Sequence, residues 1–195
     1  MIVHTLTEGR LDTAAARRLI RHAGLEPGEA YGEKGIAYIQ RKIGGFNKAA
    51  KGSTYLALVD FADLGIDCPP NAHRWLLPKP SPNLLLRLVV GKIESWLLAD
   101  AENLADFLRV PISRLPTRPE ELSDPKADLV RIAHYSRSKA IRSAIAPEEG
   151  STARIGRLYV PELSRFILGC WSIREARKRA PSLDRCVLAL QGIGK

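Results

Sequence analysis

The sequence predicts an α/β protein built on a parallel β-sheet. Residues 2–6, 54–60 and 84–90 are short runs of β-branched and apolar residues, as expected for strands that helices cover on both faces. Segments with helical spacing of apolar residues follow the first and last of these runs. Glu8 follows the first of these runs, and Asp60 ends the second. Strands that alternate with helices are typical of open parallel sheets.

The first part of the chain is predicted to form a strand–turn–helix unit and two further strands. The strand at 2–6 leads through Glu8 and Gly9 into a helical pattern over 12–24, which Gly24 stops. A second strand is predicted at 35–40, in the sequence GIAYIQ, and a stronger one at 54–60.

The middle of the chain contains a proline-rich loop, a strand and a helix. Residues 68–83 are predicted to be a loop because prolines punctuate them. The strand at 84–90 is followed by a helix over 93–108, whose apolar residues fall on one face. The predicted order is therefore β-α-β-β-loop-β-α.

The chain changes character near residue 111. A proline-punctuated loop over 110–125 precedes a helix over 127–145 with basic residues on its exposed positions, and a polar loop covers 147–156. The final segment, 160–191, is predicted to be helices interrupted by Pro181. We expect a single domain over 1–195, with a core at about 1–110 and a basic, mainly helical extension at about 111–195.

Composition excludes several classes of protein. A chain of 195 residues can bury one sizeable core, and no apolar run reaches the ~18 residues that span a bilayer. The N-terminus lacks the order of a signal peptide, so we expect a cytoplasmic protein without membrane contact. No CxxC spacing or Cys/His cluster predicts zinc or a disulfide framework. Packing roles are expected for the cysteines and tryptophans, which are Cys68, Cys170, Cys186, Trp75, Trp96 and Trp171.

The positive charge lies mainly in the C-terminal third. The net charge is +9, and residues 131–195 hold 13 Lys/Arg against 5 Asp/Glu. Such a surface is either a solvated, solubilising face or a site that binds anions, and charge alone does not separate the two.

Acidic residues are predicted to converge at one edge of the sheet. Ligands bind beyond the carboxyl ends of parallel strands, where Glu8 and Asp60 stand. Asp63 follows by one short turn, and Glu94 begins the helix after the fourth predicted strand. Carboxylates gathered in this way repel one another unless a cation neutralises them. Mg²⁺ suits such a set, because it takes oxygen ligands from one or two carboxylates, water and substrate phosphate.

Three of the acidic residues have structural alternatives. Asp12 is equally explained as a helix N-cap, Asp63 as a turn residue, and Glu94 as an early-helix partner of the helix dipole. Glu8 and Asp60 lack such an alternative, because a carboxylate at the end of a buried strand has no evident structural benefit.

Motifs along almost the whole chain resemble a known family. The pattern strand-Glu8-Gly9-x-x-Asp12-helix, followed by strand-Asp60, resembles the TOPRIM fold of topoisomerases, primases and OLD-type nucleases. The segments VVGKIESWLLAD, SDPKADLV, HYSRSKAIR and APSLDRCVLAL are similar to a bacterial TOPRIM-like family that is encoded beside AAA-type ATPases and associated with phage defence.

The resemblance implies a fold, a metal and a site. It implies a TOPRIM-like core with helices on both faces, catalytic roles for Glu8, Asp60 and Glu94, and Mg²⁺ or Mn²⁺ held by Glu8, Asp12, Asp60 and Asp63. The usual second motif is Asp-x-Asp, whereas the spacing here is Asp60-Phe61-Ala62-Asp63, so Asp67 is an alternative to Asp63.

The resemblance also implies a function. We expect a Mg²⁺-dependent nuclease acting on DNA or RNA, the effector of an anti-phage system with an ATPase partner; a homodimer is a further assembly left open. The alternatives are a non-catalytic module that binds nucleic acid or a partner, and a phosphotransferase or phosphatase with a closed pocket. Residues expected to contact nucleic acid are Lys126, Arg137, Lys139 and Arg142, with a solvated helix face or a phosphate contact equally considered for Arg174, Arg177, Lys178 and Arg179.

Overall fold

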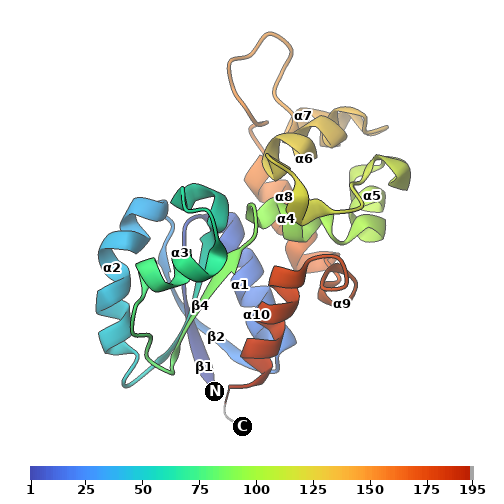
Figure 1. The fold of residues 1–195 in the computed structure, drawn as a ribbon. Coiled ribbons are helices and arrows are strands. Elements are labelled where there is room, and N and C mark those ends of the chain that lie inside the picture. The colour runs from blue at the N-terminus through green and yellow to red at the C-terminus, as the bar shows by residue number, and fades with distance from the viewer. Residues whose placement is uncertain (194–195) are drawn as a thin grey trace. The chain divides into compact units, whose positions relative to one another are not determined.

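The structure, a computed structural model, describes residues 1–193 and divides the chain into two compact units (Figure 1). The sheet unit contains Met1–Val90 together with the chain from Ser182 onward, and the helical unit is Gly91–Pro181. The boundary expected near residue 110 instead lies at Val90. The predicted C-terminal extension is likewise divided, since its last helix returns to the sheet unit.

The sheet unit confirms the predicted α/β class. Its four strands run parallel in the order β2-β1-β3-β4. Their bounds are β1 Ile2–Thr7, β2 Glu26–Gly32, β3 Thr54–Asp60 and β4 Leu84–Val89.

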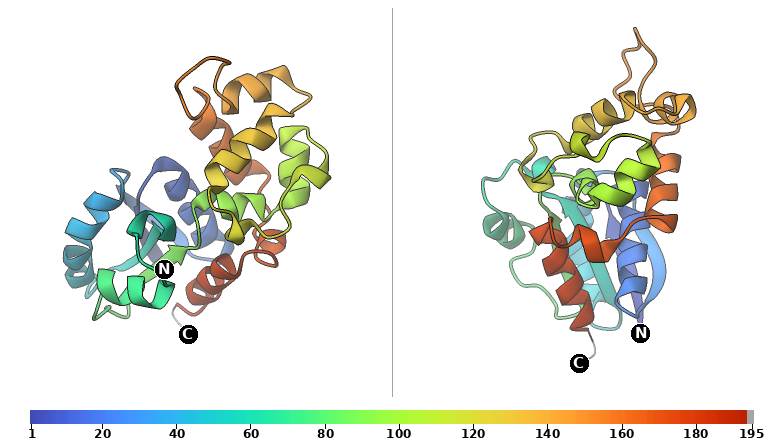
Figure 2. Two further views of the ribbon diagram at one scale, coloured as in Figure 1. Left: turned by 45° about the horizontal axis from the view of Figure 1, so that its top comes forward. Right: turned by 90° about the vertical axis from the view of Figure 1, so that its right-hand side faces the viewer.

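Helices cover both faces of this sheet, as predicted. Figures 1 and 2 show α2 (Ile36–Ala49) and α3 (Pro69–Leu76) on one face, and α1 (Arg10–His22) and α10 (Pro181–Gln191) on the other. Under α2 and α3, apolar side chains of the strands pack with those of the helices in one buried cluster that includes Leu6, Ala57, Leu86, Ile39 and Leu76. Burial on both faces explains why the interior of β3, residues 55–59, lacks charged side chains.

The strand predicted at 35–40 is wrong, because these residues begin α2. The second strand is instead β2, an edge strand whose sequence EPGEAYG is largely exposed. Contacts from elsewhere hold it: the Arg17 Nη1 donates to the Gly28 carbonyl at 3.0 Å, and the Glu29 N–H donates to His4 Nδ1 at 3.0 Å. These partners compensate for a segment with little intrinsic preference for a strand.

Three other predicted boundaries also differ from the structure. The loop predicted at 68–83 contains α3, because the proline pair at 69 and 70 begins a helix at its first positions, where a missing N–H costs nothing. The helix predicted over 93–108 is two helices, α4 (Ile93–Leu98) and α5 (Ala101–Leu108). The helix predicted over 127–145 is also two, α6 (Pro125–His134) and α7 (Lys139–Ile145).

The helical unit continues with α8 (Tyr159–Gly169) and α9 (Ile173–Ala176). Short 3₁₀ turns at Ile112–Arg114 and Pro119–Glu121 occupy the proline-punctuated loop before α6. Trp96 and Trp171 are fully buried here, as expected for packing residues, whereas Trp75 of the sheet unit is 57% exposed. Over residues 1–193, no helix is long and apolar enough to cross a membrane.

The cysteines differ in their surroundings. Cys186 of α10 is fully buried, and burial raises the pKa of its thiol to about 12, so it packs as a neutral group. Cys68 is half-buried, and Cys170 is exposed, which is at variance with the packing role expected for it.

His73 of α3 should make the stability of the sheet unit depend on pH. Burial, and then the nearby Arg87 guanidinium of β4, lower the pKa of His73 below its ordinary value. The folded state therefore disfavours the protonated imidazole, so stability is fully present above about pH 6.5 and is lost as the pH falls through the folded pKa. Thermal unfolding between about pH 7 and 5 should show this loss.

His73→Gln should reduce the pH dependence of the unfolding temperature. The same substitution at exposed His134 of the helical unit removes an imidazole but leaves His73 and Arg87 in place, so the dependence should remain. Equal pH profiles for wild type and His73→Gln would contradict this role.

Candidate functional site

The sheet opens between β1 and β3 at its carboxyl end. Backbone pairing between these strands ends at Leu6 and Ala57, whereas β3 and β4 stay paired to Asp60 and Val89. On the other side, β1 and β2 stay paired to Thr7 and Gly32. The central strands thus separate at the point where the strand order reverses direction, which is where open α/β sheets bind ligands.

The Glu8 side chain reaches the backbone of Asp60 at this opening. The backbone N–H of Asp60 donates a hydrogen bond to Glu8 Oε1 at 2.8 Å. The Glu8 side chain therefore reaches β3 where backbone pairing has ended. Glu8 is half-buried, and the Asp60 side chain is only 8% exposed. The arrangement fixes one carboxylate through the backbone that carries the other.

Two threonines that the sequence analysis did not single out hold the turn between β1 and α1. The hydroxyl oxygens of Thr7 and Thr13 lie 2.6 Å apart, and Thr13 Oγ1 donates to the Gly9 carbonyl at 3.1 Å. Both side chains are buried. Their spacing of six residues across a Glu-Gly turn was the available signal, because one hydroxyl precedes the turn and the other lies in the first helical turn.

Asp12 lies within the first turn of α1 and is not its N-cap. Gly9 occupies the N-cap position in an extended conformation, so the N-cap alternative for Asp12 is wrong. Asp12 is 6% exposed, and a Cβ built on Gly9 would lie 3.1 Å from Asp12 Oδ2. Because Gly9 has no side chain, the Asp12 carboxylate has room beside it. The helix dipole favours negative charge in this first turn of α1.

Asp63 and Asp67 lie after β3 and are exposed. Asp63 belongs to a 3₁₀ turn at Phe61–Leu64, as the turn alternative for this residue predicts. Within residues 1–193, the structure contains no group of three or more His, Cys, Asp or Glu side chains that could hold a metal ion. Of the predicted site residues, Glu8 and Asp60 are joined by a hydrogen bond between the Glu8 carboxylate and the Asp60 N–H.

Glu94 belongs to the helical unit and is 4% exposed in the first turn of α4. The hydroxyl of Tyr159, from α8, donates to Glu94 Oε1 at 2.8 Å. Burial, and then the Glu94 charge, raise the pKa of Tyr159, so the hydroxyl stays protonated and donates. Glu94 is thus a hydrogen-bonded member of the interior of this unit.

Tyr159→Phe should destabilise the helical unit by about 1–3 kcal/mol, because it removes the donor that faces a buried carboxylate. Denaturant unfolding measures this change. Tyr135→Phe is the matched control, since Tyr135 is 53% exposed in the same unit and keeps its ring. Equal denaturation midpoints for the two variants would show that the hydrogen bond from the Tyr159 hydroxyl to Glu94 does not stabilise the unit.

Three of the four basic residues expected to contact nucleic acid line three different cavities. Lys126 lines a cavity of about 710 Å³ at the start of α6, and Arg137 lines one of about 480 Å³ with Arg109. Arg142 lines a third cavity, of about 600 Å³, but its guanidinium also donates to the Ser136 carbonyl. Lys139 is exposed at the first position of α7.

The dense basic run at 174–179 is largely engaged within its own unit. Glu175 pairs with Arg174 at 3.9 Å and with Lys178 at 2.6 Å. The Arg179 guanidinium donates to the carbonyls of Ala99 and Pro116. Arg174 and Lys178 are exposed, as in the solvated-face alternative for the run, whereas Arg179 is held by backbone carbonyls.

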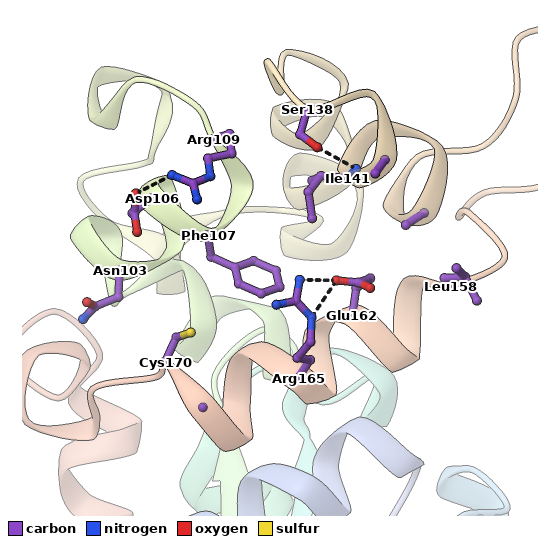
Figure 3. Close-up of a pocket in the computed structure, with 13 residues that line it drawn as sticks. Asn103, Asp106, Phe107, Arg109, Ser138, Ile141, Leu158, Glu162, Arg165 and Cys170 are labelled. Atoms are coloured by element: carbon purple, nitrogen blue, oxygen red, sulfur yellow. Dashed lines mark hydrogen bonds and ion pairs between the residues drawn. The ribbon is translucent and has the colours of Figure 1, made fainter.

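A further cavity of about 750 Å³ lies among α5, α7 and α8 (Figure 3). The Arg165 guanidinium lies 4.5 Å from the centre of the Phe107 ring and donates to Glu162 at 2.6 and 3.1 Å. Arg109 pairs with Asp106 at 3.3 Å on the opposite wall. Each arginine of this cavity is therefore matched by a carboxylate, and the cavity has little excess charge with which to attract an ion.

The fold and the opening between β1 and β3 define an open parallel α/β protein in which the Glu8 carboxylate accepts the backbone N–H of Asp60 at the switch point of the sheet. Comparison of the chain with models of protein families, with curated proteins and with solved structures gave no match.

Proposed function

We propose that the protein is a Mg²⁺-dependent nuclease of the TOPRIM type that hydrolyses phosphodiester bonds in DNA or RNA. The observation that carries the proposal is the contact between Glu8 Oε1 and the Asp60 N–H across the opening of the sheet. It fixes the Glu8 carboxylate beside the backbone of Asp60, at the place where an α/β sheet binds its ligand.

The residues at this opening fit a hard divalent cation. Glu8, Asp12 and Asp60 offer carboxylate oxygens, the ligands that Mg²⁺ prefers, and soft sulfur ligands are not part of the set. Mg²⁺ commonly binds one or two carboxylates and completes its shell with water and phosphate oxygens. A pair of carboxylates is therefore sufficient, and Glu8 and Asp60 are the residues that would hold the ion.

The chain's own groups have distinct parts in the proposed reaction. When bound, Mg²⁺ would supply positive charge to the phosphate oxygens and lower the pKa of a bound water. Glu8 accepts a proton from the attacking water, and its Oε1 is fixed by the Asp60 N–H for that purpose. Thr7 and Thr13 position the turn that carries Glu8 and so limit movement of the proton acceptor.

The proposed partners follow from the resemblance to the bacterial TOPRIM-like family. They are nucleic acid, an AAA-type ATPase that controls the nuclease in phage defence, and a second copy of the chain. The proposed site at the sheet opening is compatible both with an isolated chain and with such an assembly.

The direct test is cleavage of labelled single- and double-stranded DNA and RNA by the protein, alone and with its ATPase partner. We expect products with Mg²⁺ or Mn²⁺ and none with a chelator. Cleavage that persists in chelator would contradict the proposal. Binding without cleavage in every combination would favour the non-catalytic module.

A further inference from the structure

The helical unit contains a basic cavity at the start of α6. The cavity has a volume of about 710 Å³ and lies between α6, the residue before α4 and the polar loop before α8. Its charged and titratable lining residues are Lys92, Lys126, Arg131, His134, Arg154 and Asp124. The sequence analysis singled out Lys126 but did not group it with the others, which come from three separate segments.

Positive charge exceeds negative charge in this cavity. Four Lys/Arg side chains line it with a single acid, Asp124, whose carboxylate accepts the Ala127 N–H at 3.1 Å as the N-cap of α6. Arg131 also pairs with Asp128 on its own helix. The cavity of Figure 3 provides the contrast, because both of its arginines are paired with carboxylates. Excess guanidinium and ammonium groups favour phosphate as the ligand.

The buried ring of Tyr159 positions Lys126 at the N-terminus of α6. Its Nζ lies 5.3 Å from the centre of the Tyr159 ring, within the range of a cation–π contact. The position is reinforced by Gly91, whose φ of +76° and close approach to Pro125 pack the start of α4 onto the start of α6. A Cβ on Gly91 would lie 3.2 Å from Pro125 Cγ. This packing brings Lys92 and Lys126 to one cavity.

We propose that this cavity binds phosphate groups of a nucleic-acid backbone. The choice of nucleic acid as the source of the phosphate rests on the proposed function, whereas the attraction for phosphate rests on the cavity alone. No Phe, Tyr or Trp is among the described residues that line it, so bases have no ring to stack on. Binding should therefore depend on the backbone charge and not on base sequence.

Fluorescence anisotropy with a labelled single-stranded oligonucleotide tests the proposal, in chelator so that no metal contributes. Lys126→Gln combined with Arg154→Gln should weaken binding by about tenfold or more at about 0.1 M salt. The slope of log affinity against log salt should become shallower by about 1.4, since each phosphate contact on a single strand contributes about 0.7.

The matched control is Arg118→Gln combined with Arg174→Gln. It removes two positive charges from the same unit, at exposed residues that pair with Glu121 and Glu175 and lie outside the cavity. Its affinity should stay within about twofold of wild type, because a diffuse surface charge is worth little by comparison. Equal losses in both double variants would overturn the proposal, as would no loss in either.

Competition separates nucleic acid from a small phosphorylated ligand. Inorganic phosphate and a nucleoside monophosphate should displace the oligonucleotide only at far higher concentrations than an unlabelled oligonucleotide does. Displacement by the monophosphate at equal concentration would overturn the assignment to a nucleic-acid backbone. Oligonucleotide binding is measured in chelator and cleavage is measured with Mg²⁺, so failure of the cavity and failure of the proposed catalytic site give different results.

Discussion

Substituting Glu8 by Gln should lower the rate of phosphodiester cleavage by about 10²-fold or more, because the amide cannot accept a proton from the attacking water. The substitution nearly preserves the shape of the side chain, and the Gln carbonyl can still accept the Asp60 N–H. Asp60→Asn should have a comparable effect through loss of a ligand charge. The folded state should survive both changes, as measured by circular dichroism.

Glu33→Gln is the matched control for these variants. Glu33 follows β2 at the same edge of the sheet, where its N–H donates to the Thr7 carbonyl, and its side chain forms an exposed pair with Arg10 at 3.8 Å. Its loss should change the rate by less than about twofold, because exposed ion pairs contribute little. Asp63→Asn and Asp67→Asn, compared side by side, test whether either residue contributes to the proposed site.

Calorimetric titration of Mn²⁺ provides a second measurement that does not require cleavage. Wild type should bind Mn²⁺, Asp60→Asn and Glu8→Gln should bind it more weakly, and added metal should raise the unfolding temperature of wild type most. Without metal, removing one carboxylate from a repelling pair should leave stability unchanged or raise it. No metal binding by wild type, or cleavage that is indifferent to both substitutions, would refute the catalytic proposal.

Gly32→Ala should destabilise the sheet unit by about 2–4 kcal/mol, since it combines backbone strain with a steric clash. Gly32 has a φ of +102°, and a Cβ on it would lie 2.2 Å from the carbonyl oxygen of Thr7. Either the end of β2 or the end of β1 must move. Thr7 precedes Glu8, so Mn²⁺ affinity should fall together with stability, and both can be measured on one preparation.

Gly24→Ala isolates the contribution of the clash. Gly24 also has a positive φ, +77°, but a Cβ there would meet no atom within 4 Å. Gly24→Ala should lower the free energy of unfolding by only about 1–2 kcal/mol, from backbone strain alone, and should leave Mn²⁺ affinity unchanged. Equal losses of stability in the two variants would mean that the contact between Gly32 and Thr7 carries no energetic weight.

Local sequence patterns correctly predicted the strands whose own residues favour a buried strand. The strands β1, β3 and β4 consist mainly of β-branched and apolar residues, so each was identified within one residue of its bounds. The edge strand β2 was missed because its Pro, Gly and Glu residues favour other structures, and contacts from Arg17 and His4 hold it in place. The segment 35–40 was assigned to a strand because six residues are too short a window to distinguish alternation from helical spacing.

The positions of Glu8 and Asp60 at strand ends were therefore available from the amino-acid order, and so was their expected meeting at one sheet edge. Contacts between distant segments fixed the rest: β1 lies beside β3, backbone pairing stops at Leu6 and Ala57, and a side chain spans the gap. The Tyr159 hydroxyl donates a hydrogen bond to Glu94, and Lys126 lines one cavity with Arg131 and Arg154. Strand pairing and cavity walls join residues far apart in the chain, and short-range periodicity carries no information about such partners.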